Sequence, residues 1–222
     1  MFWRQYSREL EKQGLQSLPI VLLISVFIGA ILTIQAKTNT ENPLLPTYIT
    51  GLLTRDTLLL EFSSTILCLI LAGKVGSNIA SEIGTMRVTE QIDALTTLST
   101  NPFKYLVVPR ILAGIIMLPV LVLIGDVIGI YGGYLICIYK LDFNMTNYLR
   151  NTWNFMQSVD IVSGMTKAAV FGFIVTLMGC YNGFYSKGGA EGVGKATTSA
   201  VVASSILILI SNYMLTELFF SK

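Results

Sequence analysis

Histidine is absent from this chain of 222 residues, and cysteine occurs only three times. Without an imidazole, the chain lacks the commonest general base, the serine and cysteine triads and most zinc sites. Cys68, Cys137 and Cys180 lie far apart within apolar runs, which argues against a disulfide framework or a metal site. We therefore expect no catalytic site, metal or cofactor on this chain, and interpret the cysteines as small buried apolar residues.

Charge is also scarce. Asp, Glu, Lys and Arg make up 13% of the chain, against about 25% in an average soluble domain. Hydrophobic residues make up 53%, which leaves too little polar surface to cover a water-soluble globule. The net charge of +2 and the lack of a basic stripe argue against a nucleic-acid partner. The composition predicts an all-α integral membrane protein.

Long apolar runs organise the chain. Within a single domain over residues 1–222, they predict five transmembrane helices, at about residues 18–36, 57–80, 105–139, 159–181 and 198–220. The first run is longer than the apolar core of a signal peptide, so we interpret it as a retained span. The third run exceeds the bilayer thickness, and Pro109 and Pro119 are its natural bend points. Close-set glycines late in this run, such as Gly129 and Gly132, predict tight helix packing within one bundle or between two copies.

The first 14 residues precede these spans and carry two stripes. Phe2, Tyr6 and Leu10 recur every four residues, and three cations, Arg4, Arg8 and Lys12, form a second stripe. This pattern predicts a helix in the membrane interface with its cations toward the headgroups, and a frayed tail is the alternative. Lysines and arginines are more frequent in the segments that lie on the same side of the membrane as the N-terminus. This bias predicts a cytoplasmic N-terminus and an outer C-terminus.

The polar segment 81–103 joins the second and third spans. Gly84 is expected to break the preceding span, and Val88, Ile92 and Leu95 then share one helical face. Asn101-Pro102 is expected to end the helix, because a residue before proline is pushed out of the α region. The spacing predicts a short amphipathic helix over about 84–100, whose apolar face packs on its own bundle or on a partner.

At this segment the chain resembles a known family. AGKVGSNIASEIGTMRVTEQIDAL, residues 72–95, followed by the NP step and LVVPRILAG, is similar to the signature of the MlaE-type (YrbE-type) permeases of lipid-transporting ABC systems. SVFIGAILTIQ in the first span and YNGFYSKGGAEGVGKATT before the last extend the resemblance over nearly the whole chain.

The resemblance implies a homodimeric permease with an interfacial helix and five spans in the bacterial inner membrane, with a cytoplasmic N-terminus and a periplasmic C-terminus. A separate ABC ATPase, which holds the ATP and magnesium, docks on the coupling helix at about 84–100. MCE-domain lipid carriers lie on the outer side and exchange phospholipid with the membrane, in support of outer-membrane lipid asymmetry or supply. Whether a STAS-domain subunit takes part, and the direction of transport, stay open. The coupling residues implied are Glu82, Met86, Arg87, Glu90, Gln91, Asp93 and Leu95.

The chain departs from the family pattern at three places. Family members usually carry a longer N-terminal segment, so the interfacial helix is shortened or the true start lies upstream. Leu60 stands where the family often has an arginine before the glutamate that matches Glu61, and Asn212 stands where an aspartate is common. If that arginine binds a lipid headgroup in other family members, this chain must bind the headgroup through other residues.

Ionisable residues within the spans are the candidate lipid-pathway residues. Each costs at least about 2.5–3.5 kcal/mol at the centre of a span, so it must be paired, near an interface or in a wet cavity. We expect Glu61 and Lys167 to line a cavity open to the outer side and contact a lipid headgroup. Lys74 is assigned to the same pathway near the cytoplasmic side, and structural ion pairs or snorkelling are the alternatives. Asp126 is interpreted as a packing or solvated acid.

Other functions fit less well. The stretch Gly189 to Lys195 matches the start of a P-loop, but Ala196 follows the lysine and a span, rather than a strand, precedes the glycines. We expect a tight cytoplasmic turn there instead. An ion-driven secondary transporter is the alternative function, and it would predict inverted repeats that the sequence does not show. A membrane-embedded enzyme would need a set of catalytic side chains, and without histidine or clustered carboxylates the sequence offers none.

Overall fold

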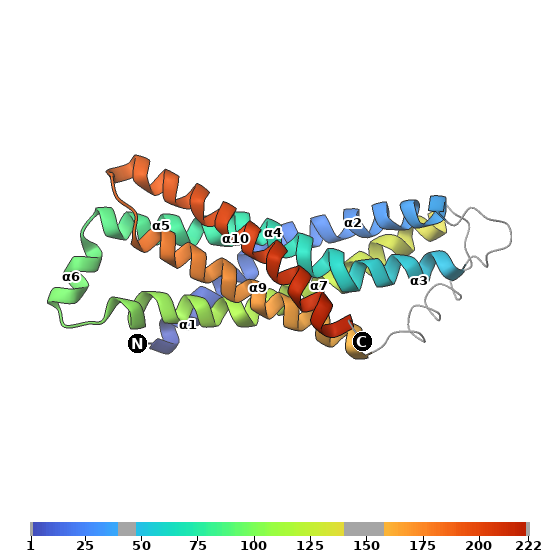
Figure 1. The fold of residues 1–222 in the computed structure, drawn as a ribbon, viewed down its shortest axis with the longest axis horizontal. Coiled ribbons are helices and arrows are strands. Elements are labelled where there is room, and N and C mark those ends of the chain that lie inside the picture. Colours follow the sequence, from blue (N-terminus) through green and yellow to red (C-terminus); the bar gives the residue numbers. More distant parts are fainter. Residues whose placement is uncertain (1, 40–47, 140–157, 221–222) are drawn as a thin grey trace. The chain divides into compact units, whose positions relative to one another are not determined.

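A computed structural model describes residues 2–39, 48–139 and 158–220 (Figure 1). Within these ranges the chain is helical with short turns and contains no strand, which confirms the all-α fold class. Among the described residues, five helical stretches are long and apolar enough to cross a membrane: Trp3–Asn39, Gly51–Val88, Phe103–Tyr139, Val159–Phe184 and Gly189–Phe220. They match the five predicted spans, and the first also contains the predicted N-terminal helix.

The helices have the following bounds. The chain begins with α1 (Phe2–Gln13), a 3₁₀ turn (Leu15–Ser17) and α2 (Leu18–Asn39), and α3 (Tyr48–Thr57) contains the start of the second span. The second span continues through α4 (Leu67–Leu71) and α5 (Ser77–Val88), and α6 (Gln91–Thr97) follows. The remaining helices are α7 (Val108–Tyr139), α9 (Ser158–Phe184) and α10 (Gly189–Phe220). In the part of the chain that the structure describes, three stretches are π-helical instead: Leu58–Ile66, Ala72–Gly76 and Phe103–Val107.

Gly84 does not break the second span, so that prediction is wrong. It lies inside α5 and is buried, and the helix continues to Val88. A Cβ at Gly84 would lie 3.2 Å from Ser186 Oγ and 3.3 Å from a methyl of Val193. The glycine therefore serves a close approach between segments rather than a helix end.

The predicted helix over 84–100 is also corrected, because the structure divides it. Thr89 and Glu90 interrupt the helix, with Glu90 left-handed at φ 59°, and the separate α6 covers only Gln91–Thr97 (Figure 1). Ser99, at φ 56°, follows α6, and Thr100 N donates to Leu95 O at 3.0 Å, which closes the helix end. The expected apolar face is reduced to Ile92, which is buried, and the half-buried Leu95, while Val88 is exposed.

The glycine-rich stretch before the last span is likewise more helical than expected. The turn is confined to residues 185–188, and Gly188 and Gly189 adopt positive φ values of 93° and 67°. From Gly189 onward the chain is α10, in which exposed Lys195 pairs with Glu191 at 2.7 Å. A helix, α9, precedes the turn, so the P-loop fold that the motif would need is absent from this described stretch.

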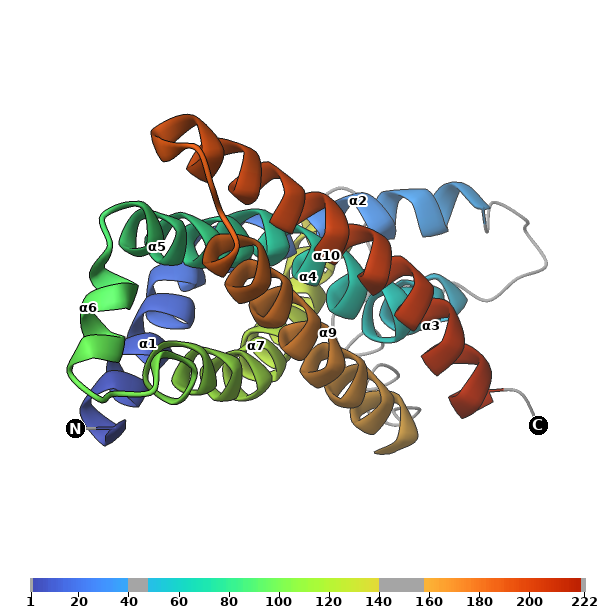
Figure 2. The ribbon, with the colours of Figure 1, turned by 60° about the vertical axis from the view of Figure 1, so that its left-hand side comes forward.

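The chain divides into two compact units. The first contains residues 1–17, 68–119 and 167–222. In this unit α5 packs against α10, and close contacts also join it to α9 (Figure 2). A Cβ at Gly179 would lie 3.0 Å from Gly76 O, and one at Gly183 would lie 2.8 Å from Ala80 O. Small residues therefore let these helices approach closely, as in other membrane bundles.

The second unit contains residues 18–67 and 120–166, of which 40–47 and 140–157 lie outside the described residues. A Cβ at Gly29 of α2 would overlap the carbonyl oxygen of Gly129 of α7. A Cβ at Gly132 would overlap Val26 O in the same way. These glycines pack α2 against α7 within one chain, which confirms the first of the two predicted roles.

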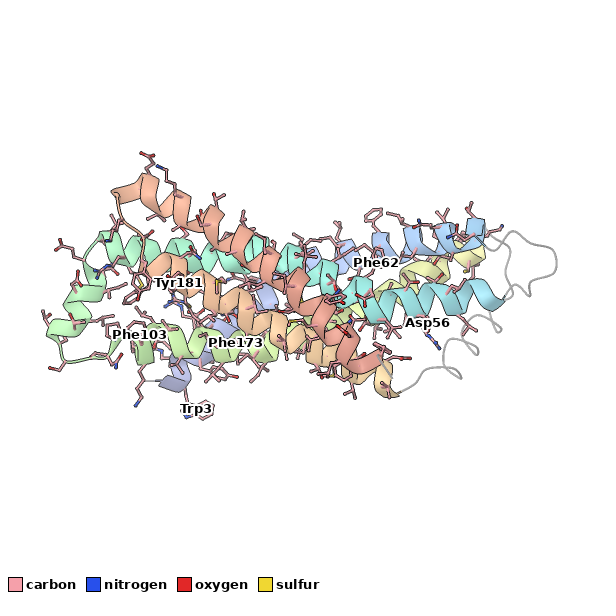
Figure 3. The ribbon with its side chains drawn as sticks, in the orientation of Figure 1. Trp3, Asp56, Phe62, Phe103, Phe173 and Tyr181 are labelled. Carbon is pink, nitrogen blue, oxygen red and sulfur yellow. The ribbon has the colours of Figure 1, made fainter. Side chains whose placement is uncertain are left out.

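Large apolar side chains remain exposed along the helices. They include Leu23, Phe27 and Ile31 on α2 and Ile206, Leu209 and Ile210 on α10. Trp3 projects from α1 with 77% of its surface exposed (Figure 3). Exposed apolar surface on this scale is expected of helices that face lipid rather than water.

Candidate functional site

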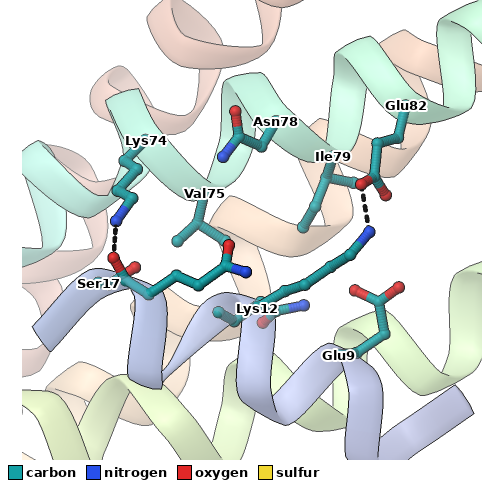
Figure 4. A pocket seen from close by; sticks show the side chains of 10 residues that line it. Glu9, Lys12, Ser17, Lys74, Val75, Asn78, Ile79 and Glu82 are labelled. Carbon is teal, nitrogen blue, oxygen red and sulfur yellow. Dashed lines mark hydrogen bonds and ion pairs between the residues drawn. The ribbon is translucent and has the colours of Figure 1, made fainter.

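A charged cluster of Glu9, Lys12, Glu82 and Arg110 joins three helices of the first unit. Arg110 of α7 approaches Glu82 of α5 at 2.9 Å and Glu9 of α1 at 3.4 Å. Lys12 of α1 reaches across to Glu82 as well (Figure 4). The cluster thus holds the N-terminal helix to the ends of the second and third spans.

Burial makes this cluster energetically sensitive. Arg110 is 5% exposed and Glu9 is 8% exposed, whereas the side chain of Glu82 keeps 40% of its surface in contact with solvent. A buried ion pair is costly to break, because the remaining charge is left without compensation. Gln13 Nε2 adds a further link by donating to Arg110 O at 3.1 Å.

The sequence did not predict this cluster. Lys12 was expected to face lipid headgroups, yet it pairs with Glu82, and Glu9 and Arg110 were not candidates at all. Glu82 was assigned to the coupling set. The available signal was weak, since Glu9 and Glu11 both place negative charges among the cations of the first 14 residues.

A groove beside the cluster collects part of the predicted coupling set. It has a volume of about 450 Å³, and Glu82, Met86 and Gln91 contribute to its walls together with residues of α1. Arg8 and Lys12 supply cations to the same groove. The groove therefore brings α1 next to the segment that leads into α6.

The other coupling candidates lie around α6. Arg87 Nη1 donates to Asp93 Oδ1 at 2.7 Å across the break, and its guanidinium lies 6.0 Å from the ring centre of Phe184. Glu90 occupies the break, and Leu95 is half-buried. Gln91, Asp93 and several threonines are exposed, so α6 presents a largely polar outer face.

The predicted lipid-pathway residues are not all in one unit. Lys74 and Lys167 belong to the first unit and Glu61 to the second, so a cavity shared by Glu61 and Lys167 stays a prediction. Lys167 is completely buried in α9, and Glu61 is half-buried. Lys74 Nζ donates to Gln16 O, which ties the second span to the start of the first.

Two of these residues share a backbone feature that the sequence did not reveal. Glu61 lies in the π-helical stretch Leu58–Ile66, and Lys74 lies in Ala72–Gly76. Such π-helical insertions often mark functional sites, because they shift the side chains that follow relative to an α-helix. Hydropathy and helical spacing cannot distinguish them from a continuous α-helix.

A hollow in the second unit lies on the same span as Glu61. It has a volume of about 270 Å³ and is formed by α2, α3 and the first π-helical stretch. Polar Gln35, Asn39 and Thr54 line it together with apolar Leu32 and Phe62. A mixed lining of this kind fits an amphipathic ligand better than a small ion.

The family model of the permease MlaE matches residues 6–218. The chain belongs to the MlaE permease family. Among its relatives, a probable ABC transporter permease protein of Rickettsia prowazekii is 55% identical over 218 residues, which cover 96% of this chain and 82% of the relative. The match covers nearly all of the described residues, including α6.

More distant relatives have more specific names. The intermembrane phospholipid transport system permease protein MlaE of Haemophilus influenzae is 33% identical over 218 residues, 96% of this chain and 82% of the relative. The chloroplastic protein TRIGALACTOSYLDIACYLGLYCEROL 1 of Arabidopsis thaliana is 37% identical over 220 residues, 98% of this chain and 62% of the relative. The chain is thus a multi-pass membrane permease of the ABC transporter type.

Proposed function

We propose that the chain is the permease subunit of an ABC-type phospholipid transporter in the bacterial inner membrane. The observation that carries the proposal is the MlaE family match over residues 6–218, together with a relative named for intermembrane phospholipid transport. Five helices of membrane-crossing length fit a subunit that provides the lipid path. Energy comes from ATP hydrolysed, with magnesium, on a separate ATPase chain.

In this proposal the ATPase docks on α6 and its surroundings on the cytoplasmic side. The exposed polar face of α6 and the groove beside it support this assignment, since a water-soluble partner reaches only the segments that lie outside the hydrocarbon core. Glu82, Met86, Arg87, Glu90, Gln91, Asp93 and Leu95 are the proposed coupling residues.

The lipid path and the remaining partners complete the proposal. Glu61, Lys74 and Lys167 are the proposed lipid-pathway residues, and two copies of the chain form the transporting unit. An MCE-domain carrier receives or supplies the lipid on the outer side, where the C-terminus lies. A STAS-domain subunit is an optional further partner, which co-purification would reveal.

Co-purification tests the proposal. Affinity-tagged full-length chain, expressed in its own host, is expected to capture an ABC ATPase and an MCE-domain protein, and the complex is expected to hydrolyse ATP. Leu95→Glu on α6 should abolish capture of the ATPase, whereas the matched exposed control Lys195→Gln on α10 should retain it.

Two outcomes would contradict the proposal. One is transport-competent chain without any ATPase partner, which would favour the ion-driven alternative. The other is abolished ATP hydrolysis in Lys195→Ala, which would indicate that the P-loop-like stretch of this chain takes part in ATP hydrolysis.

A further inference from the structure

The segment between the second and third spans has few buried side chains. Within residues 88–101 the side chain of Ile92 is buried, Leu95 and Thr100 are half-buried, and the others are exposed. α6 itself has 7 residues, which is too short for a helix to be stable alone in water. The placement of α6 on its bundle therefore depends on contacts at the two ends of this segment.

One aromatic ring meets both ends of the segment. Phe184 is the last residue of α9, and its ring centre lies 4.7 Å from that of Phe103, which follows the segment. The guanidinium of Arg87, which precedes the segment, lies 6.0 Å from the centre of the same Phe184 ring. These distances are within reach of aromatic pairing and cation–π attraction. Arg87, Phe103 and Phe184 are together called the aromatic clamp below, and all three belong to the first unit.

The end of α9 that carries Phe184 is closely packed on α5. A Cβ at Gly183, the preceding residue, would lie 2.8 Å from Ala80 O, so the two backbones approach closely beside the ring. Tyr185 also packs its ring edge-on against Phe184, with 5.7 Å between the ring centres. The Phe184 ring is thus attached to the body of the first unit rather than to the segment that it contacts.

Arg87 extends the aromatic clamp to α6. Its Nη1 donates to Asp93 Oδ1 at 2.7 Å across the break at Glu90. This ion pair is exposed, so it is weak alone. Phe184 is half-buried and contacts both ends of the segment, so it is the side chain whose loss would release both ends at once.

α9 leads from the aromatic clamp into the membrane. Completely buried Lys167, a proposed lipid-pathway residue, lies on the same continuous helix as Phe184. A packed helix can carry a displacement along its axis, because its backbone hydrogen bonds keep it rigid. A movement of α6 that reaches Phe184 is therefore passed toward the proposed lipid path.

We infer that Phe184 is a positioning residue that couples movement of α6 to α9. A docked partner that moves α6 pulls on both ends of the segment, and the aromatic clamp passes this movement to the fourth span. Phe184 acts through the residues that it holds, rather than on ATP or lipid directly. The inference rests on the proposed function in taking α6 as the docking site of the ATPase.

Hydrogen exchange tests the aromatic clamp without the ATPase. Full-length protein in nanodiscs is compared with Phe184→Leu, which keeps an apolar side chain but removes the ring. The backbone amides of residues 91–100 should exchange about fivefold faster in the variant, because α6 loses its attachment. Phe173→Leu is the matched control, since Phe173 lies on the same helix with 42% of its surface exposed, and it should leave these rates unchanged.

The ratio of lipid transferred to ATP hydrolysed tests the transmission of movement. In proteoliposomes with the ATPase and the MCE-domain carrier, Phe184→Leu should retain ATPase capture and ATP hydrolysis but transfer about fivefold less lipid per ATP. Phe184→Tyr keeps the ring and should restore the ratio. A purely structural role of Phe184 would instead lower capture, hydrolysis and transfer together.

Phe103→Leu changes the aromatic clamp at its more exposed end. Phe103 is 51% exposed, so this variant reports on the clamp even if Phe184→Leu folds poorly. It should lower the lipid transferred per ATP about twofold. Combined with Phe184→Leu it should lower the ratio no further, since the ring that Phe103 contacts is then already absent.

The inference is overturned if Phe184→Leu leaves either the exchange rates or the ratio unchanged, or if Phe184→Tyr does not restore the ratio. Full additivity of Phe103→Leu and Phe184→Leu would also overturn it, because the two rings would then act separately. Faster exchange in Phe184→Leu, in a protein whose wild type shows no ATP-driven transfer, would contradict the proposed function alone. ATP-driven transfer with unchanged exchange and ratio in Phe184→Leu would contradict this inference alone.

Discussion

The contacts inside each of the two compact units depend on different chemistry. In the first unit, the charged cluster joins α1, α5 and α7 through ion pairs. In the second, a glycine contact holds α2 to α7, with Gly29 against Gly129 and Gly132 against Val26. One contact depends on charge and its compensation, and the other on the absence of a side chain.

This difference has a physical consequence. Ion pairs that are partly open to solvent, as at Glu82, can exchange partners with water or with another charged group. A backbone contact through glycine has a single close arrangement, since any added atom overlaps its neighbour. The charged cluster also lies next to α6, so it is the better placed of the two to respond to a docked partner.

The largest expected effect comes from removing the shared cation of the charged cluster. Arg110→Met should destabilise the protein by about 3–5 kcal/mol, because it leaves Glu9 buried without a counter-charge. Thermal unfolding of the purified protein in detergent would measure the loss. Adding Glu9→Met should restore much of the stability, since no buried carboxylate then remains unpaired.

If Arg110→Met alone were harmless, the cluster would not hold the first unit together. The contrast drawn with the glycine contact would then be wrong, because buried charge would not stabilise the first unit.

The glycine contact is expected to show a purely steric effect. Gly29→Ala should cost about 1–3 kcal/mol, because its new methyl group would overlap Gly129 O and force α2 and α7 apart. Gly194→Ala in α10 is the matched control, since nothing lies within 4 Å of the Cβ it would add. Salt should change the unfolding temperature of Gly29→Ala no more than that of the wild type.

A stable Gly29→Ala variant would show that α2 and α7 can separate without cost. That result would remove the distinction drawn between the two units.

The smallest effect is expected at the ion pair beside α6. Arg87 and Asp93 lie 2.7 Å apart, but their side chains are 39% and 57% exposed. A double-mutant cycle with Arg87→Gln and Asp93→Asn should give a coupling of about 0.2–1 kcal/mol that shrinks at high salt. A coupling as large as that of the charged cluster would mean that exposure does not decide the strength of these ion pairs.

The sequence predicted the features that depend on local hydrophobicity. Long apolar runs identify the spans from their composition alone, and the stripes of residues 1–14 identify α1. The family resemblance rested on residues 72–95, and the match over 6–218 confirms it. These features need no knowledge of which segments meet in space.

The charged cluster could not be predicted in this way. Lys12 and Glu82 are 70 positions apart, and Glu82 and Arg110 are 28 apart, so only the fold shows that they meet. The break before α6 was equally hidden, because Glu90 adopts a left-handed conformation that usually belongs to glycine or asparagine. The prediction at Gly84 was wrong because its role depends on Ser186 and Val193, which lie far along the chain.

The most direct test of the account is ATP-driven lipid transfer. The chain is reconstituted in proteoliposomes with its ATPase, and transfer of a labelled phospholipid to or from the purified MCE-domain carrier is followed over time. We expect transfer that requires ATP hydrolysis and is lost in Leu95→Glu, while Lys195→Gln behaves as the wild type. Transfer that proceeds equally without ATP, or that responds only to an ion gradient, would contradict it.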